Sequence, residues 1–171
     1  DAVAIGIEDA AKQYEAMGVT INYEYLAPES ASADDQVSRL MEASKRNFDV
    51  IGVDVADVGV ITPVINQIME EGQKVMTFSS SDASKEDGCS RVAYVGNTHN
   101  REDGAALTEA LCAKLGYHGK VALLVGTAGA PCHEDRALGA QDVISQYPGM
   151  EIVEIAYDED TVEKSYAFTK E

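Results

Sequence analysis

The chain has 171 residues, of which 45% are hydrophobic, so it is long enough to bury a substantial core. Its 30 acidic residues outnumber its 13 basic ones, and the net charge of -17 repels nucleic-acid phosphates and anionic membrane surfaces. Composition therefore argues against nucleic acid as a partner, and the absence of a long apolar run argues against direct membrane insertion.

The first segments of the chain alternate between helical and extended patterns. Apolar residues recur every three or four positions as far as Met17, which predicts a helix capped by Asp1 and ended by Gly18. The stretch from Val19 to Leu26 alternates as a strand does, and a second helix is predicted over residues 33–46.

The same alternation continues to the end of the chain. Strands are predicted over 48–56, 74–80, 91–95, 120–125 and 151–157, and helices over 60–72, 103–115, 137–147 and 163–171. The strand up to Val53 is nearly all apolar, which is typical of a parallel strand covered on both faces. This order predicts an α/β fold with doubly wound parallel sheet, whose strands end along one ligand-binding edge.

The two ends of the sequence do not complete this pattern. No strand precedes the first helix, none follows the last, and no signal peptide is visible. We therefore expect a mature or trimmed chain that is part of a longer protein.

The stretch "VGTAGAPCHEDRALGAQDVI", residues 125–144, admits several kinds of site. Its glycines match neither of the two nucleotide-binding motifs, G-x-x-x-x-G-K-(S/T) and G-x-G-x-x-G. The adjacent side chains from Cys132 to Asp135 diverge too much to hold a metal. A Cys132 nucleophile would need His99 or His118 nearby in space. We therefore predict no metal, no cofactor and no catalytic residue, and interpret Cys132 as a rim or disulfide cysteine.

The cysteine count leaves the redox state open. Cys89, Cys112 and Cys132 allow at most one bridge, and three pairings of them are equivalent on sequence grounds.

Several segments of the chain are similar to one known family. They are "GIEDAAKQYEAMGV", "ADDQVSRLMEASKRNFDVIGV", "VINQIMEEGQKVMTFSSSD", "RVAYVGNTHNREDGAALTEAL", "GKVALLVGTAG" and "DRALGAQDVISQYPGMEIVE". In order and spacing they resemble the sugar-binding, ribose-binding-protein-like branch of the type I periplasmic binding proteins of ABC importers. The resemblance covers essentially the whole chain.

The resemblance implies two Rossmann-like lobes joined by a hinge, with a small ligand enclosed between them. Residues 1–96 would form most of the N-terminal lobe, without its first strand, and residues 97–171 the first half of the C-terminal lobe. "YVGNTHN" resembles the first crossing, where Asn97, His99 and Asn100 would be hinge residues. The missing parts would include an aromatic pair upstream of Asp1.

The resemblance also implies ligand contacts. Arg136 matches the arginine that opens the helix after its strand and donates to sugar hydroxyls. Where the family often has an Asp, this chain has Ser79 and Ser80, which are expected ligand contacts. Either Asp82 is the acceptor, through a longer loop, or the ligand needs fewer acceptors.

Further acids lie at the predicted strand ends. Asp54 follows its strand at the ligand-binding edge, whereas Asp57 is equally a ligand contact or a helix cap. Asp158 to Asp160 stand where the family often adds a contact from the second lobe.

The resemblance implies a solute-binding protein and not an enzyme. It would bind a pentose or hexose and present it to ABC permease subunits, in the periplasm or outside the cell, with or without a lipid anchor. The alternatives are a receptor for a sugar-like signal molecule, the effector core of a transcription regulator, a sugar-active enzyme and a self-associating module.

Overall fold

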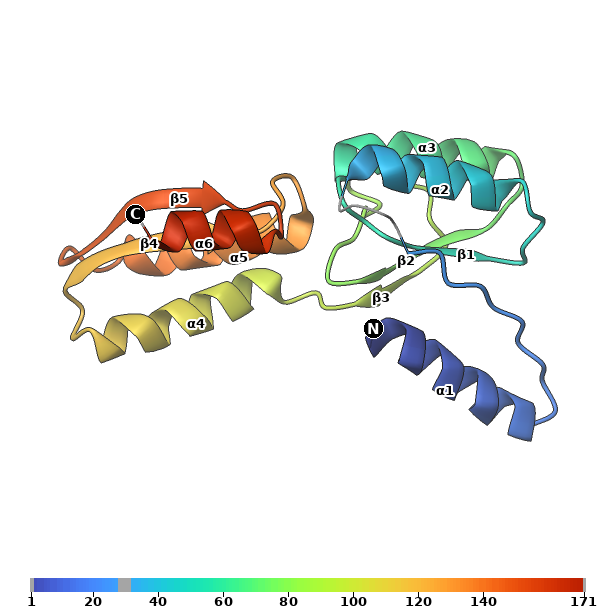
Figure 1. Ribbon diagram of the computed structural model, residues 1–171, viewed down its shortest axis with the longest axis horizontal. Coiled ribbons are helices and arrows are strands. Elements are labelled where there is room, and N and C mark those ends of the chain that lie inside the picture. The colour runs from blue at the N-terminus through green and yellow to red at the C-terminus, as the bar shows by residue number, and fades with distance from the viewer. Residues whose placement is uncertain (1, 28–31, 171) are drawn as a thin grey trace.

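Two parallel sheets, each packed beside its own helices, make up the computed structural model, which describes residues 2–27 and 32–170 (Figure 1). Its elements are α1 Ala2–Ala16, α2 Ala33–Ser44, β1 Ile51–Asp54, α3 Val58–Glu70, β2 Val75–Ser79, β3 Tyr94–Gly96, α4 Asn100–Lys114, β4 Gly119–Val125, α5 Pro131–Ile144, β5 Met150–Tyr157 and α6 Val162–Lys170. The predicted α/β class with parallel sheets is confirmed, whereas the predicted cap Asp1 lies outside the described residues.

The first sheet has the order β1-β2-β3, and α2 and α3 lie side by side on one of its faces (Figure 1). Ile61, Ile65 and Ile68 of α3 are fully buried, as their helical spacing predicts. Asp57 caps α3 by accepting from the amide of Val60 at 3.0 Å. This cap fixes where the loop after β1 ends and α3 begins.

The second sheet pairs β4 with β5 and has a core of its own. Its helices α4 and α5 pack backbone to backbone, because a Cβ atom on Gly104 would overlap the carbonyl oxygen of Arg136. A Cβ on Gly139 would likewise overlap the carbonyl oxygen of Arg101. We call described residues up to 96 the first half of the chain and residues 97–170 the second half.

The predicted strand from Val19 to Leu26 is wrong, because the structure has no strand between α1 and α2 within the described residues. A strand needs a hydrogen-bonding neighbour, and β1 pairs only with β2. The alternating apolar side chains of this segment are exposed. It is held instead by Glu24, which accepts from Arg46 at 2.7 Å.

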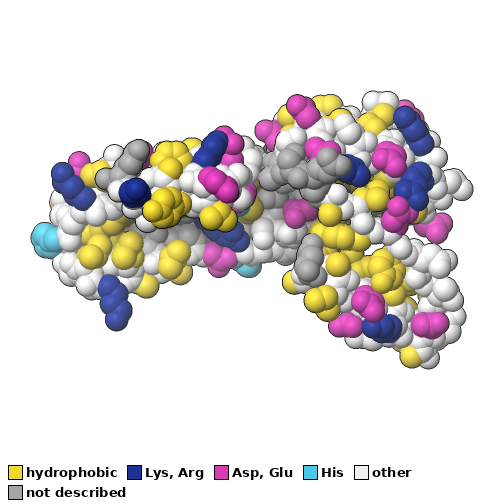
Figure 2. Space-filling model, in the orientation of Figure 1, with side chains coloured by type: hydrophobic (Ala, Val, Ile, Leu, Met, Phe, Trp, Pro, Cys, Tyr) yellow, Lys and Arg dark blue, Asp and Glu magenta, His cyan; other side chains and the backbone are white. Residues whose placement is uncertain are grey.

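Coverage of β1 on both faces is also not found. Ile51 and Val53 are buried, but Gly52 and Asp54 on the other face are exposed. Since α2 and α3 share one face, the other is left to α1, which buries none of its residues. Figure 2 shows hydrophobic side chains on α1 and on the neighbouring part of the first sheet.

Helix α5 begins at Pro131, six residues before the predicted start at Ala137. Proline fits the first helical position because the amide it lacks would have no partner inside the helix. Arg136 therefore lies in the second turn of α5 and does not open the helix, which corrects the sequence-based expectation.

None of the helices, over the described part of the chain, is long and apolar enough to cross a membrane.

We predict that Gly139→Ala lowers the free energy of unfolding by about 1–3 kcal/mol, because α4 and α5 must move apart to admit the methyl group. In an open helix the same change stabilises by up to about 1 kcal/mol. Gly6→Ala in α1, where a Cβ meets no atom within 4 Å, is the matched control. Urea denaturation followed by circular dichroism measures both, and equal stability of the two variants would contradict the prediction.

Candidate functional site

The carboxyl ends of the two sheets meet through their loops. The amide nitrogen of Cys132, at the start of α5, lies 3.5 Å from the hydroxyl oxygen of Ser81, which follows β2. A Cβ atom on Gly129 would lie 2.9 Å from Oδ2 of Asp57. We call the region formed by residues 54–57, 79–82 and 126–136 the junction.

Asp54 ends β1 at the junction, as predicted, and its carboxylate retains contact with solvent. The surrounding protein desolvates it and raises the pKa of Asp54, while hydrogen bonds from the Ser79 side chain and the Val55 amide oppose this effect. Gln36 braces the backbone here, since its side chain donates to the carbonyl of Asp54 and accepts from the amide of Ala56. The result is a fixed acceptor at the strand end.

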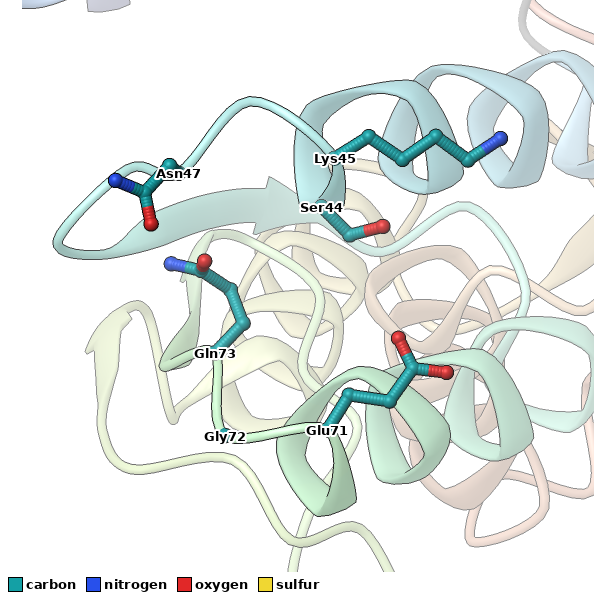
Figure 3. Close-up of a pocket in the computed structure, with 6 residues that line it drawn as sticks. All are labelled: Ser44, Lys45, Asn47, Glu71, Gly72 and Gln73. Atoms are coloured by element: carbon teal, nitrogen blue, oxygen red, sulfur yellow. The ribbon is translucent and has the colours of Figure 1, made fainter.

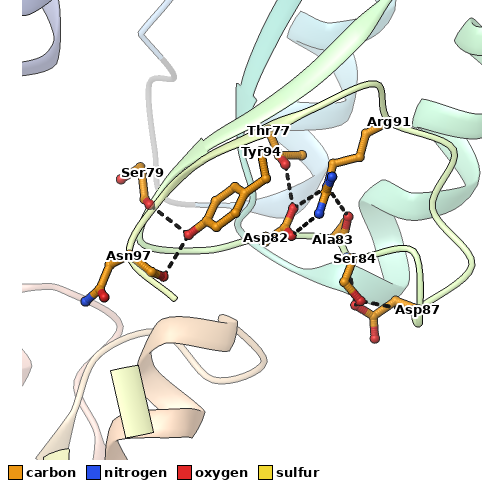
Figure 4. A network of polar contacts seen from close by, with 9 residues as sticks. All are labelled: Thr77, Ser79, Asp82, Ala83, Ser84, Asp87, Arg91, Tyr94 and Asn97. Atoms are coloured by element: carbon orange, nitrogen blue, oxygen red, sulfur yellow. Dashed lines mark hydrogen bonds and ion pairs between the residues drawn. The ribbon is translucent and has the colours of Figure 1, made fainter. Parts of the chain in front are cut away.

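Ser79 ends β2 beside this acceptor, and Ser80 follows it in the turn. The carbonyl of Ser79 accepts from the amide of Asn97 at 3.1 Å and lies 3.0 Å from the hydroxyl of Tyr94 (Figure 4). The carbonyl of Ser80 accepts from the side-chain amide of Asn100 at 2.8 Å. Their backbones therefore hold the crossing segment, and the Ser79 hydroxyl meets Asp54.

Asp82 forms an ion pair inside the first half (Figure 4). Its Oδ1 accepts from Nε of Arg91 at 2.6 Å and from the hydroxyl of Thr77 at 2.5 Å, and its Oδ2 accepts from Nη2 of Arg91 at 2.5 Å. The side chains of Asp82 and Arg91 are 18% and 13% exposed. Oδ2 keeps room for one more donor, so a ligand would share this carboxylate with Arg91.

Arg136 is the arginine of α5 that the sequence predicts at the site. It is half-buried, and its guanidinium has no hydrogen bond or ion pair with any residue of the described ranges. It lies four positions after Cys132, which places both on one face of α5. A half-buried cation without a partner is unusual, because charge removed from water needs compensation.

Asp158 and Asp160 join the two loops of the second half. Oδ2 of Asp160 accepts from the hydroxyl of Thr127 at 2.7 Å, and Nδ1 of His133 lies 3.2 Å from the carbonyl oxygen of Thr127. Asp158 accepts from the Ser165 hydroxyl and from the Asp160 amide, and these bonds lower its pKa. Their carboxylates already have partners within the chain.

Polar contacts also organise the crossing. Asn97 donates from its side chain to Asp103 at 2.7 Å and accepts from the amide of His99 at 2.9 Å. The His99 side chain is 73% exposed. Asn97 and Asn100 thus fix where α4 leaves the segment that follows β3.

A pocket of about 290 Å³ lies away from the junction (Figure 3). It is lined by Ser44, Lys45, Asn47, Glu71, Gly72 and Gln73, which belong to the turns that lead into β1 and β2. These turns are at the amino edge of the first sheet, and none of the sequence-predicted contacts lines the pocket. We take the junction as the candidate site because the polar groups of both halves gather there.

The three cysteines are free and buried. Cys89 lies in the first core, Cys112 in the second and Cys132 in the junction. Among the described residues no three of the His, Cys, Asp and Glu side chains form a group that could hold a metal ion.

Sequence reasoning missed the contacts of Arg91, Tyr94 and Ser81. The sequence predicts Arg91 only as the start of a strand, and nothing in its spacing links it to Asp82. Tyr94 and Ser81 carry a weak signal, since each lies at or next to the end of a predicted strand.

Comparison with known proteins identifies the architecture. The family described as periplasmic binding protein domain matches residues 1–171. No protein of curated function matches the sequence.

Three solved structures illustrate the similarity. An ABC transporter solute-binding protein from Burkholderia graminis, in complex with D-arabinose, has a TM-score of 0.81 and 26% identity over 94% of this chain and 53% of its own. GanP, a glucose-galactose binding protein from Geobacillus stearothermophilus, has a TM-score of 0.79 and 30% identity over 96% of this chain and 58% of its own. XylFII in the XylFII-LytSN complex has a TM-score of 0.82 but only 23% identity, over 99% of this chain and 60% of its own, so it supports the fold alone.

The chain therefore spans between 53% and 60% of the length of these structures. The sequence-based resemblance is confirmed, and since the family match extends over the whole sequence, the chain belongs to the periplasmic binding protein domain family.

Proposed function

We propose that this protein is a solute-binding protein that captures a small sugar, a pentose or a hexose, between two lobes. Residues 1–96 would belong to the first lobe and residues 97–171 to the second, with the crossing near Asn97 as hinge. One observation carries the proposal. Acceptors at the ends of β1 and β2 gather at the junction with α5, and that helix carries a half-buried arginine that has no partner among the described residues.

The chemistry of this pair suits a polyhydroxylated ligand. The carboxylate of Asp54 accepts from hydroxyl groups, and the guanidinium of Arg136 donates from several fixed N–H groups to neighbouring oxygens. The hydroxyls of Ser79 and Ser80 and the shared Oδ2 of Asp82 add weaker contacts. Discrimination between sugars would follow from buried polar groups left unpaired, which cost about 1–3 kcal/mol each.

The comparisons support the ligand class but not one sugar. Of the similar structures, one at 26% identity is in complex with D-arabinose and one at 30% identity is a glucose-galactose binding protein. Structures at 22% identity contain L-rhamnose and D-allose. We therefore propose a monosaccharide without choosing between five and six carbons, and we propose binding without turnover.

The context of binding is also a proposal. Delivery to the permease of an ABC importer, in the periplasm or outside the cell, agrees with the solute-binding relatives. The alternative role is binding of a sugar-like signal molecule, and the fold agrees with both roles, since XylFII, which shares it, is found in a complex with LytSN. The closed form would then be recognised by a receptor protein in place of a permease.

Titration calorimetry with a panel of pentoses and hexoses tests the ligand class on the intact protein. We expect one or a few sugars to bind with micromolar affinity, about -8 kcal/mol. Amino acids and nucleosides serve as the control panel. Heat from these compounds and none from the sugars would refute the proposed ligand class.

Arg136→Ala should weaken sugar binding about tenfold to a hundredfold, because hydrogen bonds from a charged donor contribute about 1.5–3 kcal/mol. Arg101→Ala is the matched control, since Arg101 lies on the neighbouring α4 and pairs with Asp142 at 2.7 Å. Calorimetry with the tightest sugar of the panel compares the two variants. Equal affinities would remove Arg136 from the site.

Affinity for the sugar should fall on acidification through the pKa of Asp54. The ionised carboxylate accepts strongly through both oxygens, whereas protonation turns one oxygen into a donor and weakens the other as an acceptor. Desolvation raises the pKa of Asp54, so this loss starts at a higher pH than for an ordinary aspartate. Asp54→Asn should weaken binding at neutral pH and flatten this part of the profile, whereas Asp49→Asn, which removes an exposed charge of the same half, should do neither. The test is the dissociation constant for D-arabinose, or for the best sugar, measured between pH 3.5 and 7.5. The same loss of affinity in acid for Asp54→Asn as for wild type would exclude Asp54 as the titrating group.

A further inference from the structure

The amino end of α5 has no cap of its own. Its N-cap residue is Ala130, which offers no side-chain acceptor, and Pro131 has no amide hydrogen. The amides of His133 and Glu134 both donate to the carbonyl of Ala130, at 3.0 and 3.1 Å. The amide of Cys132 is thus the first-turn donor whose partner comes from elsewhere.

That partner is Ser81, in the other half of the chain. Its hydroxyl oxygen lies 3.5 Å from the amide nitrogen of Cys132, a long bond between two groups withdrawn from water. Ser81 is 4% exposed, Cys132 7% and Ala130 5%. The three residues come from opposite sides of the junction, and the contact between Ser81 and Cys132 joins the two halves there.

The neighbouring residue repeats the arrangement. The carbonyl of Ser80 accepts from the side chain of Asn100, which is 5% exposed at the start of α4. Two consecutive residues after β2 therefore hold the first turns of α4 and α5. Only the contact of Ser81 reaches beyond the crossing to the helix that carries Arg136.

We propose that Ser81 is a closure latch, which caps α5 only when the two halves are together and so sets the fraction of closed molecules. The inference rests on the proposed closure around a ligand, and it assigns Ser81 a positioning role without contact to the ligand. Separation of the halves leaves the Cys132 amide to water and exposes the Cys132 thiol. Apparent affinity scales with the fraction of molecules in the binding-competent state, so loss of the latch weakens every ligand by the same factor.

The latch also acts on Arg136. Cys132 and Arg136 are four residues apart on one face of α5, so the cap on the first turn also holds the helix backbone that carries Arg136. Ser81 controls how often the arginine is in place, whereas the ligand contacts control which ligand fits.

Thiol labelling tests the latch without any ligand. The intact protein is treated with iodoacetamide, and mass spectrometry of its peptides gives a separate rate for each cysteine. Cys89 and Cys112 are buried in the first and second core, at 3% and 0% exposure, and report unfolding of either half. Ser81→Ala should raise the rate at Cys132 about two- to tenfold, the equivalent of one hydrogen bond, and leave the other two unchanged.

Two further variants sharpen the comparison. Ser44→Ala removes a hydroxyl that bonds within its own helix, to the carbonyl of Met41 at 2.9 Å, and should leave the rate at Cys132 as in wild type. Ala130→Ser gives α5 a cap of its own, so it should speed the labelling of Cys132 and reduce the additional effect of Ser81→Ala. Small-angle scattering should report a larger radius of gyration for Ser81→Ala than for Ser44→Ala.

The outcomes separate the latch from the proposed function. Equal Cys132 rates in Ser81→Ala and Ser44→Ala, or a parallel rise at all three cysteines, would overturn the latch. D-arabinose and the other sugars enter only in a second arm, where a bound sugar slows labelling of Cys132 and Ser81→Ala weakens each sugar by one common factor. Failure of every sugar to slow labelling, with the Ser81→Ala effect intact, would refute sugar binding and leave the contact in place.

Discussion

Parallel pairing of the strands is the constraint on which the rest of the structure depends. β1, β2 and β3 run in one direction, as do β4 and β5, so every loop that follows a strand leaves its sheet at the same edge. Asp54 and Ser79 are neighbours for this reason, although 25 positions separate them in the sequence. A reversed β2 would place its serines beside the pocket of Figure 3, at the amino edge.

Patterns within one element were predictable, whereas patterns that need a partner were not. The spacing of Ile61, Ile65 and Ile68 identifies α3 because a helix satisfies its backbone internally. Residues 19–26 have an equally regular alternation, yet alternation tells only which face a strand would present and not which neighbour completes its hydrogen bonds. The start of α5 is not evident from the pattern, because a proline at the first helical position resembles a loop residue.

The same distinction holds for the candidate site. The place of Asp54 was predictable because it lies at the carboxyl end of a strand, whereas Arg136 was expected at the site only through the family resemblance. The pairing of Asp82 with Arg91 was not predictable, since it depends on a loop that brings Arg91 back to the residues that follow β2. Contacts between Ser81 and Cys132, 51 positions apart, follow from the three-dimensional approach of two loops, which sequence spacing does not encode.

The glycine contacts between α4 and α5 have a mechanical consequence. Gly104 and Gly139 bring the two backbones so close that neither helix can slide or roll without a clash. Helix α4 starts at Asn100, directly after the crossing, and α5 carries Cys132 and Arg136. The helix pair should therefore move as one body, so that in the proposed closure a small rotation of the backbone near Asn97 would displace Arg136 together with both helices.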